Sequence, residues 1–255
     1  MNDLLNQIDF HQQVLHTTGL GGSVLLMSHK KNDSERYVVK LEKLDQSYNE
    51  YFGQCLFTAL GYVGIESCLM LFGNKCAGAV RYQSNLRRIY ANDISKLSSD
   101  QRKSFVALYV LNGLLGNADD GEIYIDINGN MLCLDLGEAF LGEYGVKIHR
   151  SGFSHFFTTN NQNISVEQET SFRSTFNSRI SLCLNYIDNT NEEMADEVID
   201  SGIDALYALA ELDIESLYSC FNSISEHVSK ELAEGYRAWL LQRISMAQNS
   251  LDALE

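Results

Sequence analysis

Carboxylate side chains gather around one short segment of the sequence, residues 117–140, which reads NADDGEIYIDINGNMLCLDLGEAF. Asp119 and Asp120 precede two short apolar runs, and Asp135 directly follows the second run. An Asn-Gly pair separates the runs, and this pair favours the tight turn of a β-hairpin. Carboxylates that converge at the ends of a hairpin can hold a divalent metal ion, although each of them can also serve as a polar turn residue.

Other residues supply the remaining parts that phosphoryl transfer from ATP needs, namely backbone donors over the phosphates and a lysine that holds them. The stretch GLGGSVLL at 19–26 begins with a glycine-rich turn, whose backbone N–H groups no side chain would shield. Lys40 lies within the apolar run YVVKL, where an unpaired ammonium group would be costly, and Glu50 is its expected partner. Each signal alone also fits an ordinary turn or a solvated lysine, but together they occur in the order that this chemistry requires.

The flanking sequence predicts the elements that would position these residues. The expected elements are a strand after the glycine turn, a strand at 36–42, a helix at 46–60, strands near 65–72 and 76–83, a helix from a cap at Ser99-Asp100 to Gly116, the hairpin, a polar loop at 142–165, and helices near 167–187, 192–210, 213–226 and 228–252. This order predicts an α+β fold with a β-rich N-lobe at 1–90 and an α-helical C-lobe at 91–255. The two lobes are expected to form a single domain around a cleft.

The composition narrows the possible partners and the location. The 255 residues carry a formal net charge of −15, which argues against binding to nucleic acid or to an anionic membrane surface. No apolar stretch approaches the roughly 20 residues that a membrane span needs, and no secretory signal is visible at the N-terminus. The six cysteines form no C-x-x-C pair and are expected to be buried in a reducing compartment. A cytoplasmic location is therefore expected, or an injected effector acting in a host cytosol.

Several of these segments together resemble a known family, the HipA-like kinases, which belong to the wider group of atypical protein kinases and phosphoinositide kinases. The resemblance lies in GLGGSVLL, ERYVVKLE, NEYFGQCLFTALG and LNGLLGNADDGEIYIDINGNMLCLDLGEAF. In that family a glycine-containing turn precedes a Y-V-V-K strand, an N-E pair opens the next helix, and a hairpin ends in an aspartate followed by a glycine. The similarity covers roughly residues 15–140 and extends more loosely into the helical tail.

The resemblance implies a bilobal protein-kinase-like fold that binds ATP and Mg²⁺ between its lobes and phosphorylates a serine or threonine of a protein substrate. The residues that it places over the phosphates are Gly19, Gly21, Gly22 and Ser23. It implies that Lys40 binds the α- and β-phosphates while paired with Glu50. It also implies that Asp135 chelates Mg²⁺ and that Asp119 orients the acceptor hydroxyl.

The sequence departs from the family's pattern directly before the hairpin. Where the family has D-R-H-x-x-N, this chain has the shorter Asp119-Asp120-Gly121-Glu122, which lacks the Arg-His pair. Glu122 then takes the position of the family's asparagine and is a candidate Mg²⁺ ligand, since a carboxylate can replace the amide oxygen. Asp120 is an alternative to Asp119 as the catalytic aspartate. The shortened loop leaves two functions open: a protein kinase, or a pseudokinase or nucleotide-binding scaffold that transfers no phosphate.

Overall fold

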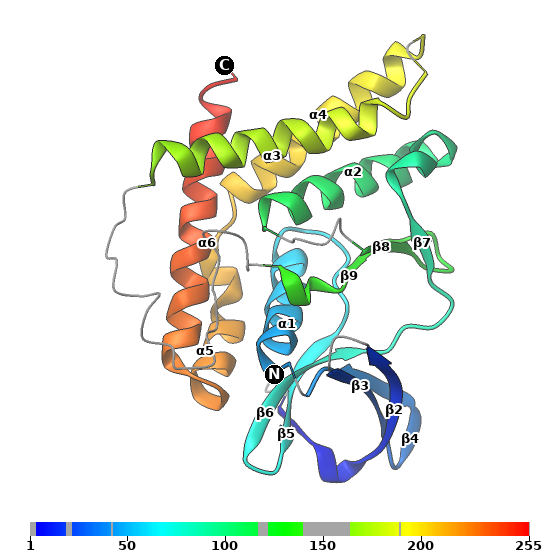
Figure 1. The fold of residues 1–255 in the computed structure, drawn as a ribbon, viewed down its shortest axis with the longest axis vertical. Coiled ribbons are helices and arrows are strands. Elements are labelled where there is room, and N and C mark those ends of the chain that lie inside the picture. Colours follow the sequence, from blue (N-terminus) through cyan, green and yellow to red (C-terminus); the bar gives the residue numbers. More distant parts are fainter. Residues whose placement is uncertain are drawn as a thin grey trace.

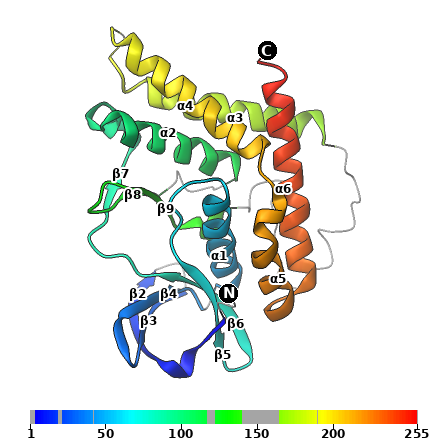
Figure 2. The ribbon, with the colours of Figure 1, turned by 180° about the vertical axis from the view of Figure 1, so that it is seen from behind.

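The computed structural model describes residues 4–18, 22–41, 43–116, 122–139, 164–188 and 190–254. It is a mixed α+β structure in which a curled sheet from the first part of the chain lies beside a group of helices from the second part (Figure 1). The view from behind shows the same arrangement, with helix α1 between the sheet and the other helices (Figure 2). The expected α+β class, with strands first and helices later, is therefore confirmed.

The curled sheet contains six strands in the order β1-β5-β6-β4-β3-β2. The strands are β1 (Leu4–Asn6), β2 (Phe10–Thr18), β3 (Gly22–His29), β4 (Asn32–Val39), β5 (Ser67–Phe72) and β6 (Lys75–Arg81). All neighbouring strands are antiparallel except β1 and β5, and the short helix η1 (Gln7–Asp9) joins β1 to β2. Apolar side chains that alternate along β3 and β4, including Leu25, Met27, Tyr37 and Val39, form the core of the sheet.

Strand β4 differs from the sequence prediction at both of its ends. Strand β4 begins at Asn32, four residues before the strand expected at 36–42, because the chain already reverses at Lys30-Lys31. The strand also ends at Val39, so Lys40 follows its last residue instead of lying inside it. The chain turns there, and the backbone N–H of Lys43 donates a hydrogen bond to the carbonyl of Lys40. Lys40 therefore leaves the sheet at the point where the chain enters helix α1.

The rest of the chain is mostly helical. Its elements are α1 (Leu44–Ala59), β7 (Arg87–Ile89), η2 (Ala91–Lys96), α2 (Ser99–Leu114), β8 (Glu122–Ile125), β9 (Met131–Leu134), η3 (Leu136–Glu138), α3 (Val166–Leu184), α4 (Glu192–Ala210), η5 (Ile214–Leu217), α5 (Tyr218–His227) and α6 (Lys230–Leu251). Strands β7, β8 and β9 form a small separate sheet in that order. The hairpin and the four C-terminal helices expected from the sequence are present, and the third of those helices begins with the 3₁₀ turn η5.

Helix α2 is capped one residue earlier than the sequence predicts. Ser98, not Ser99-Asp100, is the capping residue, because its hydroxyl accepts a hydrogen bond from the backbone N–H of Gln101. The Gln101 side chain accepts a hydrogen bond from the backbone N–H of Ser98 in return, which completes a capping box.

Helix α1 joins the two parts of the molecule. On one side it lies against β6, where Gly78 allows an unusually close approach: a Cβ atom there would lie 1.9 Å from the carbonyl oxygen of Ser47. On the other side it packs into the large apolar core, and Phe52 stacks on Tyr236 of α6 with ring centroids 4.3 Å apart. No helix within the described ranges has both the length and the apolar character needed to span a membrane.

Candidate functional site

A cavity of about 260 Å³ lies where the curled sheet, α1 and the β8–β9 hairpin meet. Its lining residues are Val38, Lys40, Ser47, Glu50, Gly78, Val80, Arg81, Tyr82, Gln83, Leu86, Glu122, Leu134 and Asp135. The apolar members come from strands β4, β6 and β9 and from the segment after β6, whereas the charged members come mainly from β4's end, α1 and the hairpin. The cavity thus combines an apolar surface with a cluster of charged groups.

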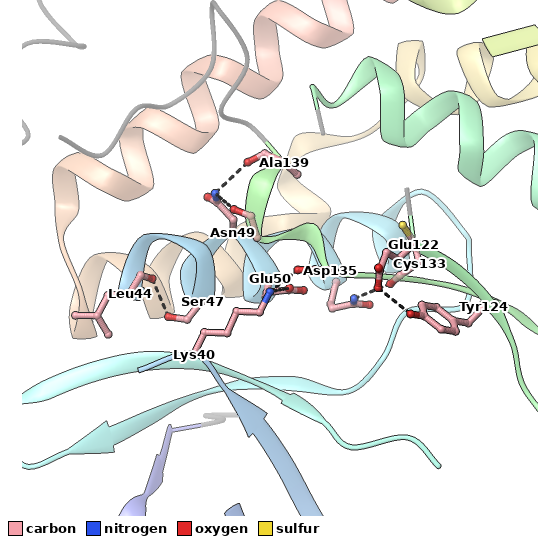
Figure 3. Close-up of polar contacts among 12 residues, drawn as sticks. Lys40, Leu44, Ser47, Asn49, Glu50, Glu122, Tyr124, Cys133, Asp135 and Ala139 are labelled. Carbon is pink, nitrogen blue, oxygen red and sulfur yellow. Dashed lines mark hydrogen bonds and ion pairs between the residues drawn. The ribbon is translucent and has the colours of Figure 1, made fainter. Parts of the chain in front are cut away.

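Lys40 lies at the centre of the charged groups (Figure 3). Its Nζ atom is 2.8 Å from Oε1 of Glu50 and also forms an ion pair with the carboxylate of Asp135. Burial acts to lower the pKa of Lys40, but the two carboxylates outweigh burial and raise that pKa above its ordinary value. The ammonium group therefore stays charged at neutral pH, and its expected pairing with Glu50 is confirmed.

Glu50 is held between two partners inside the protein. It lies in the second turn of α1 and is buried, with one carboxylate oxygen bonded to Lys40. Burial raises the pKa of Glu50, while Lys40 and the backbone N–H of Leu136 act in the opposite direction. Because Leu136 directly follows Asp135, Glu50 connects the lysine to the backbone beside the second carboxylate.

Asp135 has a backbone conformation that side chains other than those of glycine, asparagine and aspartate rarely adopt. Its φ and ψ angles are 54° and 52°, in the left-handed region. This conformation turns the chain sharply at the end of β9, so that η3 follows at once. Gly137 lies so close to the lysine that a Cβ atom there would be 3.1 Å from Nζ of Lys40. The residue sequence Asp-Leu-Gly thus suits a turn that packs directly against the charged cluster.

Glu122 lines the same cavity, but its carboxylate already has two partners. Its Oε1 atom is 2.7 Å from Nη1 of Arg88, and its Oε2 atom accepts a hydrogen bond of 2.7 Å from the hydroxyl of Tyr124. Arg88 comes from β7, which pairs with β8 in register, so that Arg88 lies opposite Tyr124. This partner could not be predicted from the sequence, since β7 was not expected as a strand.

The remaining predicted site residues are placed only in part. Gly19, Gly21, Asp119 and Asp120 lie outside the described residues. Gly22 and Ser23 begin strand β3, where their backbones pair with Thr18 and Thr17 of β2 in an antiparallel register. Residues 19–21 thus lie between two neighbouring strands in the chain, and the contact of the glycines with phosphate stays a prediction.

Asn49 was not singled out as a site residue from the sequence, but it contacts the segment that follows Asp135. Its Nδ2 atom donates hydrogen bonds to the carbonyls of Gly137 at 2.9 Å and Ala139 at 3.0 Å (Figure 3). Asn49 is fully buried on α1, next to Glu50. A polar amide in a helix beside a candidate ion-pair residue was the signal available in the sequence.

The donor set around the cavity fits a magnesium ion that is bound together with phosphates. Mg²⁺ in nucleotide sites commonly takes one or two protein carboxylates, with substrate phosphate oxygens and water as its other ligands. Asp135 and Glu122 supply two carboxylates along one cavity. No group of three or more histidine, cysteine, aspartate or glutamate side chains arranged to hold a metal occurs in the described part of the chain.

Comparison with known proteins gives a similar solved structure and no family assignment. No family model matches the sequence, and no curated protein matches it. Among solved structures the chain is similar to the crystal structure of a Helicobacter pylori proinflammatory kinase, CtkA. The two share 14% sequence identity over 96% of this chain and 98% of that chain, with a TM-score of 0.48.

Proposed function

We propose that this protein is an ATP- and Mg²⁺-dependent phosphotransferase that phosphorylates a serine or threonine of a protein substrate. The observation that carries the proposal is the charged cluster of Lys40, Glu50 and Asp135 at a cavity whose other lining residues are partly apolar. A nucleotide needs both surfaces, because its base is planar and apolar on its faces while its phosphates are anionic. The acceptor class comes from the resemblance of the sequence to HipA-like kinases.

The apolar residues of the cavity suit the base of the nucleotide. Val38 and Val80 belong to neighbouring strands of the sheet, and Leu134 approaches from the hairpin. Val80 also belongs to a small buried cluster against which Leu134 and Leu86 pack, so these side chains have fixed positions. Packing of a flat ring against such side chains removes apolar surface from water and gains dispersion energy.

The charged residues suit the phosphates. Lys40 keeps its proton, and the hydrogen bond to Glu50 fixes the position of its ammonium group. On nucleotide binding, Lys40 would exchange its contact with Asp135 for phosphate oxygens, and Asp135 would become available as a metal ligand. Mg²⁺, when bound, would neutralise phosphate charge. The chain's own contribution is then mainly positioning and electrostatic stabilisation, as in other phosphoryl-transfer sites.

One contact favours a second candidate function, nucleotide binding without phosphoryl transfer. Glu122 was expected to be a metal ligand, but both of its oxygens have partners in Arg88 and Tyr124. If Glu122 keeps these partners when ATP is bound, Asp135 is the remaining one of the two carboxylates expected to hold the metal. A pseudokinase would bind the nucleotide with Lys40 and Asp135 and transfer no phosphate.

A radiolabel assay separates these functions. The purified chain is incubated with γ-labelled ATP and Mg²⁺, alone and with a serine- and threonine-rich protein such as casein. Lys40→Ala and Asp135→Ala are each expected to reduce labelling by about 100-fold or more, the size of effect that loss of a preorganised charge produces. Lys96→Ala is the matched control, because Lys96 is an exposed lysine whose partner is Asp93, a residue outside the cavity lining.

A thermal-shift titration with ATP and Mg²⁺ accompanies the assay, because a ligand that binds the folded chain must raise its melting temperature. A raised melting temperature without any labelling would favour the pseudokinase. Undiminished labelling in both cavity variants would refute the proposed role of the cluster, and the absence of both labelling and shift would refute nucleotide binding itself.

A further inference from the structure

A buried chain of hydrogen bonds connects the C-terminal helix α6 to the segment that follows Asp135. The hydroxyl of Tyr236 on α6 donates to Oδ1 of Asn49 on α1, with 2.5 Å between the oxygen atoms. Nδ2 of Asn49 in turn donates to the carbonyls of Gly137 and Ala139. Tyr236 and Asn49 are both fully buried, so no surface function explains why these polar groups lie there.

The amide of Asn49 is well suited to this position. A side-chain amide has two N–H donors and a carbonyl acceptor, and here both backbone carbonyls and the tyrosine hydroxyl use them. An aspartate could not donate to the two carbonyls, and a leucine of similar size could neither donate nor accept. Because each unmade hydrogen bond would leave a buried polar group without a partner, the three contacts hold one another in place.

The segment held by Asn49 determines where the Asp135 carboxylate lies. The chain reverses at Asp135 in a left-handed conformation, which persists only where the surrounding structure enforces it. The residues that follow Asp135 contact α1 in three places. The backbone N–H of Leu136 bonds to Glu50, and the Leu136 side chain packs against Gly53. The carbonyls of Gly137 and Ala139 accept hydrogen bonds from Asn49. Of these, the contact through Asn49 extends to α6, because Tyr236 fixes the orientation of the amide.

We propose that Asn49 and Tyr236 are positioning residues that hold Asp135 in the geometry needed to bind a divalent metal together with ATP. The inference rests on the proposed function, because it concerns the metal carboxylate of that same site. It goes further in making the binding of metal and nucleotide depend on α6, a helix that begins 95 residues after Asp135 and has no residue in the cavity lining.

The test compares Tyr236→Phe and Asn49→Leu with a matched variant, Tyr48→Phe. Tyr48 is also buried on α1, and its hydroxyl donates a hydrogen bond of 2.8 Å to the carbonyl of Cys76, away from the segment after Asp135. Tyr48→Phe and Tyr236→Phe therefore each remove one buried, hydrogen-bonded tyrosine hydroxyl. Isothermal titration calorimetry measures the affinity of each full-length variant for ATP with and without Mg²⁺. Melting temperatures show that each variant is folded.

The wild-type chain is expected to bind ATP more tightly with Mg²⁺ than without it. In the presence of Mg²⁺, Tyr236→Phe and Asn49→Leu are expected to bind ATP about 10-fold more weakly than the wild type, a difference of about 1.4 kcal/mol. Their affinity for ATP without Mg²⁺ is expected to stay near that of the wild type. Tyr48→Phe is expected to keep the full magnesium effect. Since Tyr236→Phe keeps the ring that stacks on Phe52, it provides the decisive comparison even if Asn49→Leu does not fold.

Three results would overturn the inference, and each can be distinguished from the others. If the wild-type chain shows the magnesium effect and Tyr236→Phe retains it fully, the positioning role is wrong and the proposed function stands. If all variants lose affinity for ATP alone by the same factor, the network has a general structural role. A wild-type chain that binds no ATP overturns the proposed function, and the positioning role with it.

Discussion

The left-handed conformation of Asp135 predicts different stabilities for three replacements that should all lose magnesium-dependent ATP binding. At φ 54° and ψ 52°, an ordinary L-residue such as alanine costs about 1–2 kcal/mol. Glycine avoids that cost, but its greater conformational freedom stabilises the unfolded chain by about 0.4–1 kcal/mol and so offsets part of the gain. Asp135→Ala is therefore expected to be about 1 kcal/mol less stable than Asp135→Gly.

Asparagine tolerates the left-handed region as well as aspartate does. Asp135→Asn loses the ion pair with Lys40, but the aspartate side chain is 40% exposed, so the pair contributes at most about 1 kcal/mol. Asp135→Asn is thus expected to lie within about 1 kcal/mol of the wild type. All three variants lack the carboxylate and are expected to lose the magnesium-dependent part of ATP binding.

Urea unfolding measures the stability of each variant at unchanged m-value, and calorimetry with ATP and Mg²⁺ measures binding. The two readouts test separate statements. An Asp135→Ala variant as stable as Asp135→Gly would show that the left-handed conformation is wrong. An Asp135→Asn variant that keeps the magnesium effect would show that Asp135 is not the metal ligand, whatever its conformation.

Two further predictions concern the scaffold around the site. Burial acts to raise the pKa of Glu197, but the hydroxyl of Ser99 and the guanidinium of Arg102 hold that pKa below its usual value, so the ionised carboxylate stabilises the fold above the usual pKa and ceases to do so as the pH falls through the lowered pKa. Glu197→Gln should therefore lower the unfolding free energy by about 1–2 kcal/mol near neutral pH and by progressively less on acidification. A difference in urea unfolding that does not change with pH would contradict this prediction. Gly78→Ala would place a Cβ atom 1.9 Å from the backbone oxygen of Ser47, so we expect a loss of roughly 1–3 kcal/mol in the same assay, and an unchanged stability would show that α1 does not approach β6 so closely.

The elements with a strong local pattern could be predicted from the sequence. Helix α1 and the β8–β9 hairpin carry apolar residues at helical and strand spacing, and their interiors are buried as expected. Strand β2 was not expected, because it lies at the edge of the sheet and its sequence is largely polar. Val14 and Leu15, two of its few apolar residues, are 52% and 41% exposed, so the usual alternation between core and solvent is missing.

Within the candidate site, the contacts that follow from chain order were predictable and those that cross between elements were not. Lys40 and Glu50 are separated by one turn and the start of a helix, so their pairing could be inferred from the cost of an unpaired lysine. The Arg88–Glu122 pair depends on β7, a strand of three residues that has no clear pattern of its own. The contact between Asn49 and Tyr236 joins residues that lie far apart in the sequence, and it follows only from how α6 packs against α1.

The most direct test of the proposed function is a crystal structure of the chain with a non-hydrolysable ATP analogue and Mn²⁺, whose anomalous signal locates the metal. We expect the base between Val38, Val80 and Leu134, the phosphates beside Lys40, and a metal peak at coordination distance from the carboxylate of Asp135. A nucleotide bound outside this cavity, or a metal with no contact to Asp135, would contradict the account.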